Sequence, residues 1–117
     1  MLRLPIRFAG SYSFDGRKTH PTSGITLDED LIVVGTPATL DIRIDLEAVT
    51  GLQPFVRFPS LAWGLRVEHL DATVRSPLFL HLPALLRPSR ALAALAARPG
   101  LAKARVDLAA WKFLLPR

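Results

Sequence analysis

The loop between Asp15 and Gly24, with the sequence DGRKTHPTSG, holds the densest group of side chains that could bind an anion. Arg17 and Lys18 are adjacent in this loop, and His20 follows two residues later. Cations that converge on one point bind phosphate or carboxylate groups through charge-assisted hydrogen bonds. Two permanent cations are fewer than a phosphate site usually has, so solvated loop charges are the competing interpretation. Arg17 and Lys18 are therefore candidate anion-binding residues.

Arg3 and Arg7 form a second candidate anion site, because they are spaced as Arg-x-x-x-Arg ahead of a strand-rich body. This pair resembles the first half of the cyclic di-GMP signature of PilZ domains, which are small barrels with C-terminal helices. The second half of that signature requires an acid or amide at Thr19 and a serine at Pro21, and neither is present. A ligand-sensing domain for a cyclic dinucleotide or an anionic lipid headgroup is therefore the alternative function.

The residue types that carry out catalysis or hold metals are present, but they lack the required spacing. No Gly-x-Ser-x-Gly motif occurs, and the absence of cysteine excludes thiolate chemistry and disulfides. No His-x-x-x-His spacing occurs, and we expect the ring nitrogens of His69 and His81 to find local partners. Asp28, Glu29 and Asp30 are consecutive, whereas a calcium loop places its ligands at alternate positions. We expect a protein that is not an enzyme and that holds no metal or cofactor.

Aromatic residues near two arginines raise the question of nucleic-acid binding. Phe55, Phe58 and Trp63, near Arg57 and Arg66, could form a platform on which the bases of a single strand stack. Aromatic residues at strand spacing are equally suited to a core, which is their usual place. Nucleic-acid binding is therefore a minor alternative.

The elements that must position these side chains are mainly strands, and the clearest one runs from Thr39 to Val49, TLDIRIDLEAV. Its aliphatic residues alternate strictly with charged ones, as expected for a strand with one buried and one solvated face. The inward side chains are expected to be Leu40, Ile42, Ile44 and Leu46. We expect Thr50-Gly51 to end this strand.

Further short segments are typical of strands, because β-branched and aromatic residues are bounded by Gly, Pro and Asp. They span residues 6–14 with a bulge at Gly10, 25–27, 31–34, 55–58, 61–70, and 72–82 with an interruption at Ser76-Pro77. The Ala/Leu run that follows Pro88 predicts a helix over 89–98 with Ser89 as its N-cap. The predicted class is α+β: a small, bent antiparallel β-sandwich or partial barrel of six to seven strands with one or two C-terminal helices.

The segment 99–117 is predicted to form the second of these helices, which would be basic and amphipathic. One apolar stripe at helical spacing consists of Leu101, Ala104, Leu108, Trp111 and Leu115. A second stripe, which includes Phe113, lies roughly opposite. A helix that is apolar on two sides needs two neighbours, unless a groove of its own domain encloses it. We therefore expect a protein partner or a second copy of the chain to contact Trp111, Lys112, Phe113 and Leu115.

The chain has 117 residues and a net charge of +5, and this length suits one domain with a real core. Residues 1–58 hold six basic and seven acidic side chains, whereas residues 59–117 hold nine and three. The basic end predicts an acidic partner, such as a protein, anionic lipid or nucleic acid, unless its charges only solvate the surface. No apolar run is long enough for a transmembrane helix and no secretory signal is evident, so we expect a cytoplasmic protein.

The order of these elements resembles that of the PH-like superfamily, in particular the GRAM and bacterial PH-type domains. The resemblance rests on GITLDEDLIVVGTPATLDIRIDLEAVTGL, the Pro-bounded strand after it, WGLRVEHLDATVRSP and the Ala/Leu helix. It implies a bent β-sandwich or partial barrel that a helix closes, with a PH-like domain over residues 1–98 and the basic helix over 99–117. Some members bind phosphoinositide headgroups, and many bind proteins or oligomerise. The resemblance therefore implies a non-catalytic binding or assembly module.

Overall fold

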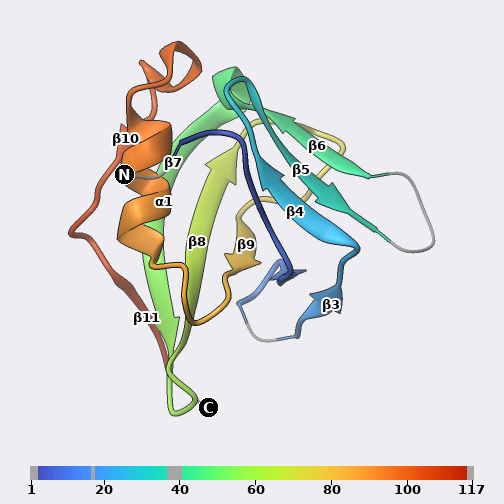
Figure 1. Ribbon diagram of the computed structural model, residues 1–117, viewed down its shortest axis with the longest axis vertical. Helices are drawn as coiled ribbons and strands as arrows, with labels where there is room; N and C mark the ends of the chain where they lie inside the picture. The colour runs from blue at the N-terminus through green and yellow to red at the C-terminus, as the bar shows by residue number, and fades with distance from the viewer. Residues whose placement is uncertain (1–2, 17, 37–40, 116–117) are drawn as a thin grey trace.

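The computed structural model describes residues 3–16, 18–36 and 41–115 and contains two β-sheets and one α-helix (Figure 1). Sheet A has four strands in the spatial order β1 (Ile6–Phe8), β4 (Gly24–Leu27), β5 (Leu31–Gly35) and β6 (Ile42–Asp45). Sheet B has seven strands, namely β2 (Ser11–Ser13), β3 (His20–Pro21), β7 (Val49–Arg57), β8 (Ala62–His69), β9 (Leu78–His81), β10 (Arg105–Val106) and β11 (Lys112–Leu114). The helix is α1 (Pro88–Ala96). The strand-rich class is confirmed, since 44% of the chain is β, and the helix follows β1–β9 and precedes β10 and β11.

The β4–β5 hairpin forms as predicted, because two short aliphatic strands flank an acidic turn. Ile25 is opposite Val34 in this antiparallel pair, and both side chains are fully buried. The backbone N–H of Asp28 donates to the carbonyl of Leu31 (2.9 Å) and closes the turn. Strand alternation therefore gives sheet A a buried inner face and a partly exposed outer face.

The alternating segment before Val49 buries the face that its sequence predicted. Ile44 and Leu46 are fully buried, while Asp45 and Glu47 are exposed. Residues 39 and 40, which begin the predicted strand, lie outside the described residues. The prediction of which face enters the core is therefore confirmed for the part of the segment that the structure describes.

The predicted strand ends sooner than expected, and the next one begins sooner. β6 gives way to a 3₁₀-helix over Leu46–Ala48, where the N–H of Leu46 donates to the carbonyl of Asp30 (2.9 Å). β7 then runs through Thr50-Gly51, so the strand end predicted there is wrong. The register of the β7–β8 pair shifts between Val49 and Gly51, so β7 is irregular at the place where the strand end was predicted, but it continues through it.

Residues 6–14 form two strands in different sheets, and the predicted single bulged strand is wrong. β1 pairs with β4 in sheet A, whereas β2 pairs with β9 and β3 in sheet B. The chain crosses between the sheets at Ala9-Gly10, where a Cβ on Gly10 would overlap the carbonyl oxygen of His81. Only glycine allows the two backbones to approach so closely.

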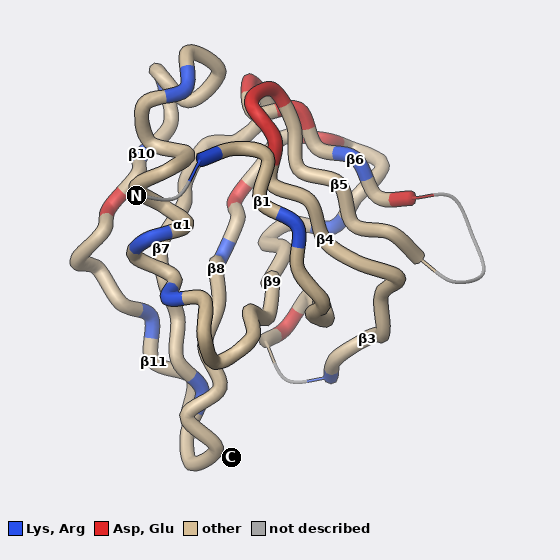
Figure 2. The backbone as a smooth tube through the Cα atoms, in the orientation of Figure 1, with Lys and Arg blue, Asp and Glu red and all other residues tan. Residues whose placement is uncertain are grey.

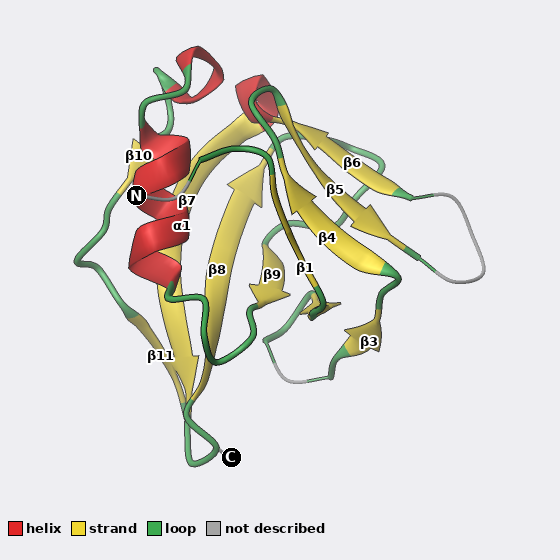
Figure 3. Cartoon of the chain, viewed as in Figure 1, coloured by secondary structure: helices red, strands yellow, loops and turns green. Residues whose placement is uncertain are grey.

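α1 contacts β7 and β8 and covers one face of sheet B, which we call its inner face (Figure 3). Ala91, Leu92 and Leu95 are fully buried at helical spacing. Pro88 occupies the first turn and Arg87 the N-cap, so Ser89 is not the cap. α1 has nine residues, and no helix in the described ranges is long and apolar enough to cross a membrane.

The main core lies between sheet A, the inner face of sheet B and α1. Its buried residues include Ile25, Leu27, Ile32, Val34, Ile44, Leu46, Leu52, Leu65, Val67, Leu78, Leu80, Leu92 and Leu95. Phe55 and Phe79 are also buried but are not part of this cluster. Alternation along β7 and β9 points them to the opposite, outer face of sheet B.

The predicted C-terminal helix over 99–117 is wrong for the residues that the structure describes. A short 3₁₀-helix, η2 (Pro99–Leu101), is followed by β10 and β11, and both strands pair with β7 in parallel. The side-chain amide of Gln53 on β7 donates to the carbonyl of Ala110 (2.8 Å) between them. The segment is thus built into sheet B.

The free edge of β7 explains why strands form there. Unpaired N–H and C=O groups along a strand edge are unfavourable when they are buried, and β10 and β11 satisfy them. The N–H of Asp107 donates to the carbonyl of Leu52 (3.1 Å). The carboxylate of Asp107 accepts from the N–H groups of Ala109 and Ala110 and turns the chain between the two strands. Tertiary pairing therefore overrides the helix propensity of the Ala/Leu sequence.

The predicted architecture needs two further corrections. The described residues form eleven strands where six or seven were predicted, in sheets that are not closed into a barrel, which the predicted sandwich or partial barrel does not require. Three of the extra strands, β3, β10 and β11, have only two or three residues, too few to show a periodic pattern. Because β10 and β11 are parallel to β7, sheet B is mixed and not purely antiparallel.

Candidate functional site

Large apolar side chains are exposed together at one end of the molecule. Their exposed fractions are 61% for Leu61, 100% for Leu85, 59% for Phe113 and 61% for Leu115. Leu61 lies in the β7–β8 turn, and β11 ends beside the start of that turn. The turn that carries Leu85 contacts Trp63, whose Nε1–H donates to the carbonyl of Pro83 (3.3 Å). We call the surface formed by Phe58, Leu61, Trp63, Leu85, Phe113 and Leu115 the apolar tip.

The pairing of β11 with β7 holds Phe113 and Leu115 at this tip. The N–H of Phe58 donates to the carbonyl of Leu114 (2.9 Å), which fixes the end of β11 against the end of β7. The rings of Phe58 and Phe113 stack with their centroids 6.0 Å apart. Strand alternation turns Leu114 to the opposite face and leaves Phe113 and Leu115 exposed.

The predicted partner-binding residues are only partly brought together. Phe113 and Leu115 share the apolar tip, Lys112 is exposed on the other face of β11, and Trp111 is half-buried. Strand pairing, and not the predicted helical stripe, produces this arrangement. Sequence reasoning missed Leu61 and Leu85, because the positions of two turns bring them to the tip.

Charge is distributed unevenly over the molecule (Figure 2). The acidic residues Asp28, Glu29, Asp30, Asp45 and Glu47 gather around the β4–β5 turn and the following 3₁₀-helix, which the Leu46–Asp30 hydrogen bond joins. This acidic end lies opposite the β7–β8 turn (Figure 2). Basic residues lie on the elements that flank the apolar tip, namely Arg57, Arg87, Arg90 and Lys112. The tip therefore combines exposed apolar area with positive charge.

A hollow of about 240 Å³ lies at the loop that was predicted to bind an anion. Lys18 and His20 line it together with Phe14, Asp15 and Arg75. Arg75 comes from the β8–β9 connection, and its guanidinium carbon lies 5.3 Å from the centroid of the Phe14 ring. Sequence reasoning missed Arg75, because the pairing of β2 with β9 brings it to the loop. We call this site the loop hollow.

The other predicted anion-binding residues do not join Lys18. Arg17 lies outside the described residues. Arg3 is exposed ahead of β1, and Arg7 lines a different hollow, on the outer face of sheet A. Arg3, Arg7 and Lys18 therefore do not form a single anion site.

The pairing of β2 with β9 buries a contact between Ser13 and His81 that the sequence did not predict. Ser13 Oγ lies 3.0 Å from His81 Nε2, and the N–H of Gly16 donates to the same hydroxyl oxygen (3.0 Å). The hydroxyl can then donate its proton to a neutral imidazole. Ser13 is fully buried, so a substrate cannot reach its oxygen. The pair instead fixes the loop that follows β2.

We expect the protein to lose stability as the pH falls from about 6.5 to about 4, and therefore to be less stable at about pH 5 than at about pH 7.5. Burial, and secondarily the charge of Arg57, lowers the pKa of His81 from 6.5 to about 4, while Asp15 opposes the shift. Between these pKa values the unfolded chain binds a proton that the folded protein does not. The free energy of unfolding should therefore fall by about 2 kcal/mol at pH 5, and below pH 4 His81 should cause no further loss.

Urea denaturation of the wild type and of a His81→Gln variant at both pH values measures this effect. The variant should lack the His81 contribution, while acid effects from carboxylates should be common to both proteins. An identical pH dependence of the two proteins would contradict the assignment.

His69 has local partners, which confirms the expectation for this residue. The N–H of Asp71 donates to Nδ1 (3.1 Å), and Nε2 lies 3.0 Å from the carbonyl oxygen of Arg75. Nδ1 therefore carries a lone pair and Nε2 the proton. His69 thus closes the connection that carries Arg75 into the loop hollow.

The predicted aromatic platform for nucleic acid is not assembled. Phe55 is fully buried on the outer face of sheet B, where its ring packs edge-on against Phe79 and His81 at 5.2 Å. Trp63 belongs to the inner face, because strand alternation separates it from the Phe55 side of the sheet. The two rings therefore cannot stack on the same strand of nucleic acid.

No protein-family model matches the sequence, and no curated protein matches it either. The fold and the surfaces described above define a mostly β domain with two sheets, one helix, an apolar tip and a cationic loop hollow.

Proposed function

We propose that the protein is a non-catalytic binding or assembly module of PH-like type whose apolar tip contacts a protein partner or a second copy of the chain. The observation that carries this proposal is the grouping of four exposed apolar side chains at one end: Leu61, Leu85, Phe113 and Leu115. Single exposed apolar residues are common, whereas several of them at one end of a molecule, beside basic residues, are typical of interaction surfaces. A strand-rich body followed by one helix supports the PH-like class; the open sheets and the parallel C-terminal strands depart from it.

The charges around the tip define the chemistry of the partner. A surface that is apolar at its centre and acidic at its rim would complement the tip and its basic surroundings. The acidic end of a second copy has the required charge. Such a head-to-tail contact uses different surfaces on the two copies, and it produces open chains if its rotation does not close into a ring.

Combining Phe113→Ser with Leu115→Ser should weaken association by about ten-fold or more, because apolar anchors dominate binding energy. Both side chains are largely exposed, so the fold should tolerate the change. Light scattering over a concentration series at low and high salt measures self-association, and capture experiments with both proteins measure partner binding. Leu108→Ser is the matched control, because it lies in the same segment, is 44% exposed and is not part of the tip.

A wild type that stays monomeric and captures the same proteins as the double variant would contradict the tip proposal. Deleting residues 100–117 is a poorer test. The deletion would also remove the buried Leu101 and uncover the edge of β7, so a loss of binding could follow from misfolding.

The loop hollow favours the alternative function, recognition of an anionic ligand. Lys18, His20 and Arg75 line one hollow, and its volume of about 240 Å³ suits a single phosphorylated headgroup better than a cyclic dinucleotide. Binding to phosphoinositide vesicles that is lost on Arg75→Gln but kept by the tip double variant would support this alternative in place of the tip.

A further inference from the structure

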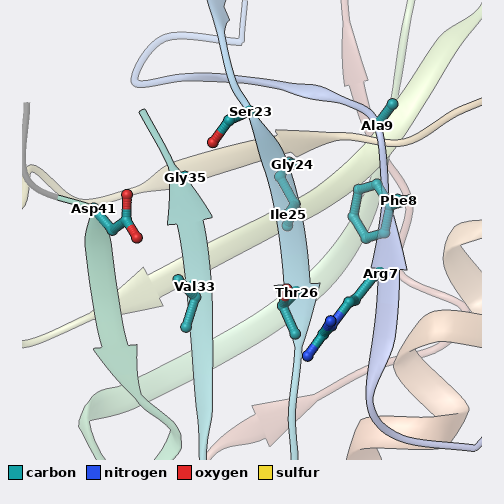
Figure 4. Close-up of a pocket in the computed structure, with 10 residues that line it drawn as sticks. All are labelled: Arg7, Phe8, Ala9, Ser23, Gly24, Ile25, Thr26, Val33, Gly35 and Asp41. Atoms are coloured by element: carbon teal, nitrogen blue, oxygen red, sulfur yellow. The ribbon is translucent and has the colours of Figure 1, made fainter. Parts of the chain in front are cut away.

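The outer face of sheet A has a hollow of about 490 Å³, which none of the proposals above uses (Figure 4). Its walls come from β1, β4, β5 and the residue before β6. Arg7, Thr26 and Val33 form one row across the sheet, because they are paired in register on neighbouring strands. This volume falls within the range of small-molecule sites, about 300–1,000 Å³.

The floor of this hollow is bare backbone. Gly24 is paired with Gly35, and Ala9 lies beside them at the end of β1. A Cβ on Gly24 would meet only the carbonyl oxygen of Phe8, at 3.9 Å, so the space above it is open. Gly24 also has a φ of +143°, a conformation that residues with side chains rarely adopt. The space above Gly24 is therefore free of side chains, whereas the hydroxyl of Ser23 lies over Gly35, where an added Cβ would overlap it.

Opposite charges lie on opposite sides of the hollow. Figure 4 shows Arg7 on the β1 side and Asp41 on the far side, beyond Gly35. Of the carboxylates in the described ranges, none forms an ion pair with Arg7. Asp41 Oδ1 accepts the N–H of Thr36 (3.3 Å), and Oδ2 has no hydrogen-bond partner among the described residues. Three strand spacings, about 14 Å, separate β1 from β6, and Asp41 lies two residues before Arg43, which ends the Arg7 row. The two charges therefore lie diagonally across the hollow, with room for a small molecule between them.

We propose that this hollow binds a small zwitterion, a free amino acid or a short unblocked peptide, with its carboxylate on Arg7 and its ammonium group on Asp41. A guanidinium binds a carboxylate through paired, charge-assisted hydrogen bonds. A simple anion would be repelled by Asp41 and a simple cation by Arg7, so the hollow favours a ligand that carries both charges. The hydroxyls of Ser23 and Thr26, which also line the hollow, are available for the polar backbone of a peptide.

Titration of the isotopically labelled full chain with alanine, Ala-Ala and Ala-Ala-Ala, followed by amide NMR shifts, tests the proposal. We expect saturable shifts centred on Gly24, Thr26 and Gly35. The probe that binds most tightly shows whether the hollow prefers a free amino acid or a peptide. N-terminal acetylation or C-terminal amidation should each weaken binding by about ten-fold or more, because each removes one charge. Equal binding of the doubly blocked peptide, or no shifts with any probe, would overturn the proposal.

Substitutions of Arg7 and Asp41 test whether each charged side chain contributes to binding. Arg7→Gln and Asp41→Asn should each weaken binding of the best probe by about ten-fold, while the amide spectrum reports that the fold is kept. Arg43→Gln is the matched control, because Arg43 pairs with Val33 at the far end of the same row but does not line the hollow. Unchanged affinity in both test variants, or an equal loss in the control, would overturn the assignment.

Discussion

Replacing Gly64 by alanine should destabilise the protein by about 3 kcal/mol or more, enough to leave much of the chain unfolded under mild denaturing conditions. A Cβ on Gly64 would overlap the carbonyl oxygen of Leu80 and lie 2.8 Å from both the carbonyl carbon of Leu80 and Cε1 of Phe55. These atoms belong to the backbone of a central strand and to a fully buried ring. Neither can move without disturbing sheet B.

The matched control for this prediction is Gly51→Ala. The nearest atoms to a Cβ on Gly51 belong to Glu68, at 3.6 Å, which is an ordinary contact distance. Chemical denaturation of both variants measures the difference, and Gly51→Ala should change the free energy of unfolding by less than about 1 kcal/mol. Equal stabilities of the two variants would show that β8 and β9 do not pack as closely as described.

The second large effect is expected for Ile44→Asp in β6. Ile44 is fully buried between sheet A and the rest of the core, so the substitution places an unpaired carboxylate in an apolar site. The loss should be about 4 kcal/mol or more, a large part of the stability of a domain of this size.

The neighbouring substitution Asp45→Lys should be nearly silent, because Asp45 is exposed on the opposite face of the same strand. Thermal or urea unfolding of the two variants, made side by side, measures the contrast. If the protein tolerated both changes equally, the assignment of faces along this strand would be wrong.

The features predicted correctly from the sequence are those that depend on local periodicity. Alternation identified the buried face at Ile44 and Leu46, turn residues identified the β4–β5 hairpin, and an Ala/Leu run identified α1. In each case residues that are close in the sequence determine the local structure, and the tertiary fold is consistent with that local preference.

The features predicted wrongly depend on which strand edges are left free. The segment after Pro99 has helix-forming residues, but it lies beside an unpaired edge of β7, and the edge determines its structure. Residues 6–14 look like one strand, yet the two halves pair in different sheets. Neither outcome leaves a periodic signature in the sequence.

Candidate site residues were likewise predicted where residue type alone identifies them and missed where they depend on strand register. Phe113, Leu115 and Lys18 were singled out because their residue types stand out in the chain, and the structure places each in an exposed surface or a hollow. Arg75 and the Ser13–His81 pair were missed, because each depends on the register between β2 and β9. Register joins residues that are far apart in the sequence.

The parallel pairing of β10 and β11 with β7 has a consequence for how the chain is made. During synthesis β7 emerges well before the segment that covers its edge. The edge therefore stays unpaired while β8, β9 and α1 are synthesised. An uncovered strand with Phe55 and Val56 on it is a template for pairing with other nascent chains. The segment from Arg105 to Leu114 is synthesised late, and its pairing with β7 covers the exposed edge and so lowers the risk of aggregation.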